Sequence, residues 1–156
     1  MSSKWMKWGA CFIVLHFILF IFLKVPVVQL NFDQEIYYVK EDIFQIKWIH
    51  SVEKEEWMEV YERKGRSIVL TETYFKTFGA GMPSDGKIVD SDAGYVHMKI
   101  DRLMKEINLV VSKNVQTTIE TKSGETHLYE LTEDQSNVHI SVQSVHLWDY
   151  MGGKSL

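Results

Sequence analysis

The sequence predicts a mainly β fold, an antiparallel β-sandwich or small barrel, preceded by one N-terminal transmembrane helix. A charge-free run over Trp8–Leu23 predicts the helix. From Asn31 onward, short stretches of β-branched and aromatic residues recur between turn residues, which is typical of an antiparallel β protein. No segment after Leu30 keeps a 3.6-residue apolar period, so we expect no helical layer in the folded part.

The N-terminal run has the features of an uncleaved membrane anchor. A bilayer crossing needs about 20 apolar residues, and Val25–Leu30 extend the apolar stretch beyond Lys24, whose long side chain can reach the interface. Pro26 has no backbone N–H and is expected to end the helix. A cleaved signal peptide is the alternative, but no small-x-small cleavage site follows the apolar core.

Charge around the run predicts its orientation and the division of the chain. Lys4 and Lys7 outnumber Lys24, so the N-terminus is expected in the cytoplasm. We therefore expect a membrane anchor over residues 1–30, made of a cytoplasmic stub and the transmembrane helix, and an extracytoplasmic β domain over residues 31–156. The predicted location is the cell membrane, as a single-pass protein whose helix contacts lipid.

The β domain shows period-two alternation, in which residues such as Phe44, Ile46 and Trp48 occupy one face of a strand. Gly65 predicts a hairpin turn between two of the strands. Asp101–Glu106 is a candidate for one short helical turn, and the tail Gly152–Leu156 is expected to be loose. The predicted strands are 36–39, 43–50, 57–63, 68–78, 95–100, 107–112, 115–121, 126–131 and 138–148.

Composition excludes several classes of function. The net charge of −4 and the absence of a basic stripe argue against a nucleic-acid partner. Cys11 is the sole cysteine and lies in the apolar run, so the β domain has neither a disulfide nor a thiolate metal site. His97, His127, His139 and His146 lack the paired spacing of metal ligands. We therefore predict no metal and no cofactor.

The densest polar cluster is the segment His50–Glu59. If the strands on either side pair as a hairpin, His50 lies near acidic residues of the connecting loop, an arrangement that suits acid–base work or cation binding. A histidine bonded to backbone beside a solvated acidic loop is the commoner arrangement. Ser51 follows His50 directly, and adjacent strand residues point to opposite faces, so the two are not expected to act as a nucleophile pair. No catalytic residue is predicted, and we do not expect an enzyme.

A glycine-rich loop over Phe78–Gly86 is the second marked segment. Glycines allow backbone N–H groups to converge on an anion, but no Gly-Lys-Ser/Thr and no helix follow, so the loop is not a phosphate-binding P-loop. The alternative is a tight turn that needs positive φ, with Phe78 or Met82 tucked inward.

Two motifs in this order, Trp48–Glu59 and Phe78–Pro83, resemble the signature of a bacterial and archaeal family, the domain of unknown function 1850 (DUF1850). The pattern is His-Ser-Val-Glu, then Trp and Glu, then a Gly-Ala-Gly-Met loop. The resemblance extends from about Ile36 onward and is weaker in the second half of the chain. The residues that it carries over as a signature are His50, Ser51, Glu53, Trp57, Glu59, Gly79, Gly81 and Met82.

The resemblance implies a setting and no activity. Such proteins are typically small and commonly encoded beside tripartite ATP-independent periplasmic (TRAP) transporters, which combine an extracytoplasmic receptor for small acidic solutes with a fused permease. It therefore implies a non-enzymatic accessory that docks on the solute receptor or on the permease. The alternative is a small ligand- or metal-binding module that uses the His50–Glu59 hairpin and the Gly79–Met82 loop.

Overall fold

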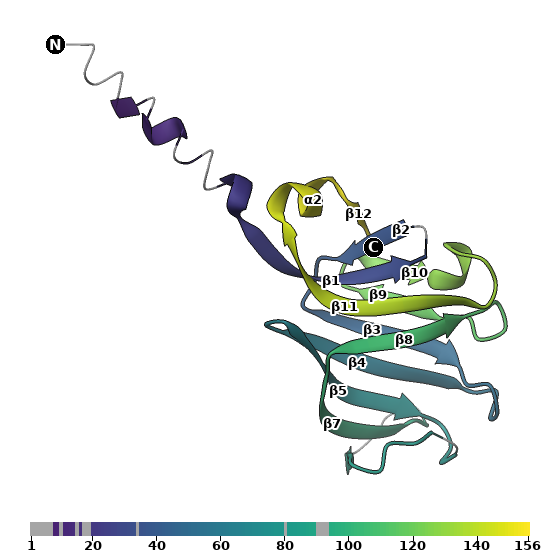
Figure 1. Cartoon of the computed structure of the whole chain (residues 1–156). Helices are drawn as coiled ribbons and strands as arrows, with labels where there is room; N and C mark the ends of the chain where they lie inside the picture. The colour runs from purple at the N-terminus through teal and green to yellow at the C-terminus, as the bar shows by residue number, and fades with distance from the viewer. Residues whose placement is uncertain are drawn as a thin grey trace.

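The computed structural model describes residues 8–9, 11–14, 16, 20–33, 35–79, 81–89 and 94–156 (Figure 1). Residues 8–9, 11–14, 16 and 20–22 are helical and exposed. The expected transmembrane helix over Trp8–Leu23 falls partly outside the described residues. Across the ranges that are described, no helix has the length and apolar character needed to span a membrane.

The remainder of the described chain is mainly β, which confirms the predicted class. The elements are β1 Lys24–Phe32, β2 Glu35–Val39, β3 Ile43–Ile49, β4 Glu56–Lys64, β5 Ser67–Phe75, β6 Lys87–Val89, β7 Val96–Met104, β8 Glu106–Val111, β9 Thr118–Thr121, β10 Gly124–His127, η1 Leu128–Glu130, β11 Ser136–His146, α2 Leu147–Gly152 and β12 Lys154–Ser155.

These strands form two sheets, as Figure 1 shows. The five-stranded sheet has the order β12-β2-β1-β11-β8, in which β12 runs parallel to β2 and the other neighbours are antiparallel. The seven-stranded sheet has the order β10-β9-β3-β4-β5-β7-β6 and is antiparallel throughout the described residues.

The main hydrophobic core lies between the two sheets, and Trp57, Phe75 and Met98 form a second, smaller cluster. Val28 and Leu30 of β1 and Ile140 of β11 contribute to the main core from the five-stranded sheet, while Phe44 and Tyr61 contribute from the seven-stranded sheet. The rings of Phe44 and Tyr61 stack with centroids 5.4 Å apart. The two sheets therefore bury their inner faces against each other, as the period-two pattern predicts.

The predicted end of the anchor at residue 30 does not hold, because Lys24–Leu30 belong to β1. This strand pairs with β11 along its whole length and with β2 over Val28–Phe32. Its apolar residues are buried by the second sheet, so their hydrophobicity reflects a central strand. Pro26 does not end a helix. Pro26 pairs with β11 on one side, and its other side lies outside the β1–β2 pairing, which covers only Val28–Phe32. The missing N–H is therefore tolerated at this position.

Two other local predictions are wrong because the segments pair with strands that are distant in sequence. Asp101–Met104 are strand residues of β7, because Leu103 pairs with Val69 of β5 and this ladder outweighs the weak helical preference of the segment. The C-terminal tail is not loose. Lys154–Ser155 pair with β2, and the Leu156 N–H donates to the Tyr38 carbonyl at 3.1 Å.

The hairpins that carry the signature motifs are as predicted. β3 pairs with β4 from Ile43↔Glu62 to Ile49↔Glu56, and β4 pairs with β5. Gly65 adopts φ of 64° in the turn between β4 and β5, a conformation that favours glycine. The β3–β4 connection and the loop after β5 therefore lie at the same end of the seven-stranded sheet.

Candidate functional site

The β3–β4 connection holds His50 against Glu53. The His50 N–H donates to the Glu55 carbonyl at 2.8 Å, and the Lys54 N–H donates to the His50 carbonyl at 3.0 Å. Lys54 has φ of 58°, which reverses the chain tightly enough to bring the Glu53 carboxylate onto His50 Nδ1. Both side chains are half-buried, at 17% and 20% exposure, so this contact is partly shielded from water. Ser51, in the same turn, is exposed.

Trp57 forms the floor beneath this pair. Its ring stacks on Phe75 at 4.9 Å and on Trp48 at 5.9 Å between centroids, and it lies 5.3 Å from the His50 ring. The indole Nε1–H donates to the buried Thr73 hydroxyl at 2.8 Å. Because the indole is fixed on its faces and at its polar edge, the histidine rests on a rigid apolar surface.

The Gly79 loop returns directly onto the β3–β4 connection. A Cβ added at Gly79 would lie 2.6 Å from Glu53 Cδ, so any other residue would require the Glu53 side chain to shift. The Thr77 hydroxyl donates to the Glu55 carboxylate at 2.7 Å and ties the same two segments together. The two signature motifs, far apart in sequence, therefore form one continuous feature, the motif cluster of His50, Glu53, Trp57 and Gly79.

The motif cluster is closely packed and is bordered by exposed apolar side chains. The described side chains around His50 and Trp57 leave no volume for a water-sized molecule between them. Val52 is 68% exposed and Phe78 is 59% exposed. Met82, further along the loop, is 37% exposed, and Gly81 before it adopts φ of 82°. Phe78 packs its ring edge-on against the buried Phe75 ring at 5.5 Å but stays largely exposed, and Met82 is also exposed.

Glu59 lies apart from the motif cluster, on the inner face of β4. In the ladder it stands between Ile46 of β3 and Thr73 of β5, both buried. Its carboxylate accepts a hydrogen bond from the Tyr61 hydroxyl. Burial raises the pKa of the Glu59 carboxyl, against the hydrogen bond from Tyr61 and the charge of Arg102, which lower it.

The separation of Glu59 divides the predicted site residues into two groups. Glu59 lines a cavity between the sheets, with Trp48 and Tyr61. His50 and Glu53 belong to the motif cluster, beside the Gly79 loop. The alternation along β4, which puts Glu59 on the face of Trp57 and Tyr61, was the sequence signal for its inward position.

A third pair, Glu72 and His97, was not predicted from sequence. Glu72 Oε2 lies 2.9 Å from His97 Nε2 and accepts a hydrogen bond from Tyr74 at 2.5 Å. The Tyr74 and His97 rings stack at 4.2 Å. The Tyr74 hydrogen bond lowers the pKa of Glu72, and burial raises the pKa of Tyr74 to about 12. The β5–β7 register brings these residues together, and one sequence cannot show that register.

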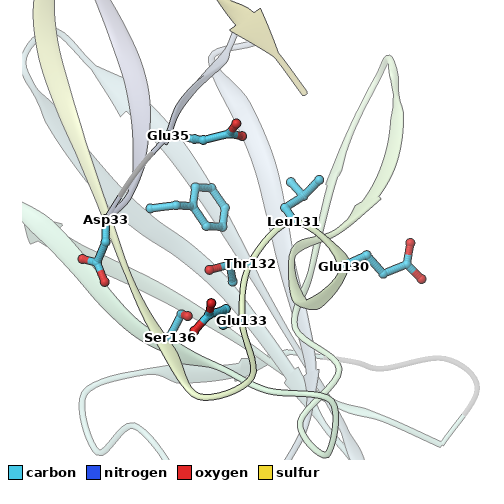
Figure 2. A pocket seen from close by; sticks show the side chains of 8 residues that line it. Asp33, Glu35, Glu130, Leu131, Thr132, Glu133 and Ser136 are labelled. Atoms are coloured by element: carbon cyan, nitrogen blue, oxygen red, sulfur yellow. The ribbon is translucent and has the colours of Figure 1, made fainter.

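An acidic hollow of about 450 Å³ lies between the β1–β2 turn and the segment from η1 to β11 (Figure 2). Asp33, Glu35, Glu130 and Glu133 line it, and Figure 2 shows their carboxylates at separate points around the hollow. Glu35 is already bonded by the Lys154 ammonium at 2.5 Å. Within the described part of the chain, no group of three or more His, Cys, Asp or Glu residues is arranged to hold a metal ion.

Comparison with known proteins places both motifs in one family. A family model described as a domain of unknown function (DUF1850) matches residues 44–128, which is more than half of the chain. The match spans β3 to the start of η1 and so includes the motif cluster, Glu59 and the Gly79 loop. No curated protein and no solved structure matches the chain. The chain belongs to the DUF1850 family.

Proposed function

We propose that this protein is a non-enzymatic accessory of a TRAP-type solute transporter, an extracytoplasmic β-sandwich held at the membrane by its N-terminal segment. The observation that carries the proposal is the contact of Gly79 with Glu53, which joins the two signature motifs into one surface. The resemblance to proteins encoded beside TRAP receptors and permeases supplies the class of partner.

The character of that surface favours docking over catalysis or ligand capture. The motif cluster has no internal space for a small molecule among its described residues. His50 and Glu53 form its polar centre, and the same two loops carry the exposed apolar side chains of Val52, Phe78 and Met82. Apolar side chains around a fixed polar centre are typical of protein interfaces. We refer to Val52, Phe78 and Met82 as the docking rim.

The sequence before β1 supports the proposed membrane attachment. The run Trp8–Leu23 carries no charge, and Lys4 and Lys7 precede it. β1 begins at Lys24, so the β domain would start directly at the end of the helix. Protease added to spheroplasts should therefore digest the β domain while the N-terminal segment stays in the membrane fraction. Protection of the β domain in intact spheroplasts would contradict this orientation.

Co-purification tests the partner. The full chain, tagged at its C-terminus and extracted from its native membrane in mild detergent, should recover a TRAP receptor or permease subunit, identified by mass spectrometry. Phe78→Asp and Val52→Asp should lower this recovery about tenfold or more, because a charge would have to be buried at the interface.

Leu103→Asp is the matched control. Leu103 is 69% exposed and lies at the end of β7 remote from Val96, which pairs with Phe75 beside the motif cluster. Thermal melting should show that all three variants fold. Failure to recover any transporter subunit with the unmodified chain, or an equal loss with Leu103→Asp, would overturn the proposal.

A further inference from the structure

The Glu59 cavity is a second site, separate from the docking rim. It has a volume of about 290 Å³, close to the lower end of ligand pockets in proteins. Ile46, Trp48, Glu59 and Tyr61 line it from the seven-stranded sheet. The other wall is Ile107–Val110 of β8, with Val115 and Thr117 from the connection that follows.

The cavity lies at an open edge of the fold. β8 is the last strand in the order of the five-stranded sheet, so no described strand covers its outer side. Val110 is 59% exposed there, while Ile107 of the same strand is buried against the core. The cavity is partly open to solvent, and apolar side chains from both sheets line it.

Glu59 is the single acid in this lining, and the lining contains no Lys, Arg or His among the described residues. The Tyr61 hydroxyl donates to it but brings no positive charge. Arg102 acts on Glu59 through its charge, yet its guanidinium is bonded to Asp85 at the surface. A carboxylate with an apolar environment and no cationic partner is electrostatically incomplete.

We propose that this cavity binds a small organic cation, a primary amine with an apolar body. The ammonium group would donate to the Glu59 carboxylate in a charge-assisted hydrogen bond. The aromatic walls of Trp48 and Tyr61 would favour the positive charge through cation–π contact. Ile46 and Leu109 would contact the apolar body.

Other ligand classes fit the cavity less well. A divalent metal requires several oxygen or nitrogen ligands, and Glu59 is the single charged residue among the described residues that line the cavity. A small acidic solute would meet the negative charge of Glu59 with no cation to offset it. A neutral apolar molecule would gain from the walls but would leave the carboxylate unpaired.

Calorimetric titration distinguishes these classes with three ligands that share one ring. The full chain, purified in a non-ionic detergent, is titrated at about pH 7 with benzylamine, benzyl alcohol and benzoate, with empty micelles as the blank. Benzylamine should bind about tenfold or more tightly than benzyl alcohol, because the ion pair is absent with the alcohol. Benzoate should not bind.

Variants locate the site. Glu59→Gln keeps the shape of the side chain and should weaken benzylamine about tenfold or more, whereas Glu62→Gln, the same change on β4, should leave affinity unchanged. Leu109→Phe should block the cavity with Glu59 intact, which keeps the test decisive if Glu59→Gln fails to fold.

Three results would overturn the inference: equal binding of alcohol and amine, unchanged affinity in Glu59→Gln or in Leu109→Phe, or no binding of benzylamine. Neither variant alters Val52 or Phe78, so co-purification with a transporter subunit should persist in both. Failure of amine binding would therefore leave the proposed docking function intact, and failure of docking would leave the cavity intact.

Discussion

Gly79 lies against the carboxylate of Glu53, at a distance that leaves no room for a Cβ. A Cβ at residue 79 would stand 2.6 Å from Glu53 Cδ and 3.1 Å from Glu53 Cγ. Moving the Glu53 side chain aside would break its contact with His50. This contact joins a glycine and an acid from the two separate motifs.

Gly79→Ala should therefore destabilise the protein by about 1–3 kcal/mol through overpacking. The loss should fall below about 0.5 kcal/mol in a Glu53→Ala background, where the obstructing side chain is gone. Chemical denaturation of the two single variants and the double variant gives the coupling free energy.

Gly81→Ala is the internal control for that cycle. Gly81 has φ of 82°, and a Cβ there meets no described atom within 4 Å. The substitution should be destabilising by about 1 kcal/mol through backbone strain alone, with or without Glu53. If Glu53→Ala relieved both glycine variants equally, the contact between Gly79 and Glu53 would not be the cause.

Thr73→Val should destabilise the fold by about 1–3 kcal/mol, because it leaves the buried Trp57 Nε1–H without its acceptor. Valine has nearly the same shape, so the change is one of hydrogen bonding. In a Trp57→Phe background the same substitution should cost less, since only the hydrogen bond from the Thr73 hydroxyl to the Met58 carbonyl is then lost. Denaturant melts of the four proteins measure the difference.

Thr71→Val on the same strand provides the comparison. The Thr71 hydroxyl donates to the Val60 carbonyl at 3.0 Å and has no bond to Trp57. Its effect on the free energy of unfolding should be the same with tryptophan or phenylalanine at residue 57. If Thr73→Val also changed the free energy of unfolding equally with tryptophan or phenylalanine at residue 57, the hydrogen bond from the indole would contribute nothing.

Glu59→Gln should change how stability depends on pH. Burial raises the pKa of the Glu59 carboxyl above its ordinary value of 4.5, so the folded state holds this proton more tightly than the unfolded state. The resulting stability is fully present below about pH 4.5 and is lost as pH rises through the folded-state pKa. Relative to the unmodified protein, Glu59→Gln should therefore gain melting temperature from acid to neutral pH.

Melts of both proteins between about pH 4 and pH 8 measure this trend. Glu62→Gln on β4 corrects for the general effect of removing one negative charge. A Glu59→Gln variant that lost stability toward neutral pH would mean that the ionised carboxylate is favoured in the folded state, contrary to its position between Ile46 and Thr73.

A chain that begins at Asn31 should not fold, whereas a chain that begins at Leu23 should. The shorter chain lacks Val27, Val28 and Leu30, all buried, and most of the ladder between β1 and β11. Removing one such side chain typically destabilises by about 2–5 kcal/mol, and whole domains are stable by only about 5–15 kcal/mol. Circular dichroism and thermal melting compare the two, and a cooperative transition in the shorter chain would contradict the central role of β1.

Local patterns predicted the elements whose residues alternate over several positions. Phe44, Ile46 and Trp48 marked β3, and Gly65 marked the turn between β4 and β5, because a half-buried strand and a left-handed turn each leave a short-range signal. Val27 and Val28 gave no alternation, since β1 is apolar along most of its length, and that pattern does not separate a buried strand from an apolar helix.

The residues of the candidate site also divide into those that local sequence predicted and those that only the fold brought together. The sequence by itself determined the mainly β class, the two motifs, and the face that Glu59 shares with Trp57, because each depends on neighbouring residues. Only the tertiary structure decided that Gly79 closes on Glu53 and that Glu59 lines a different cavity. Both facts depend on loop closure and sheet packing between residues distant in the chain, and those long-range contacts are not encoded in any local pattern.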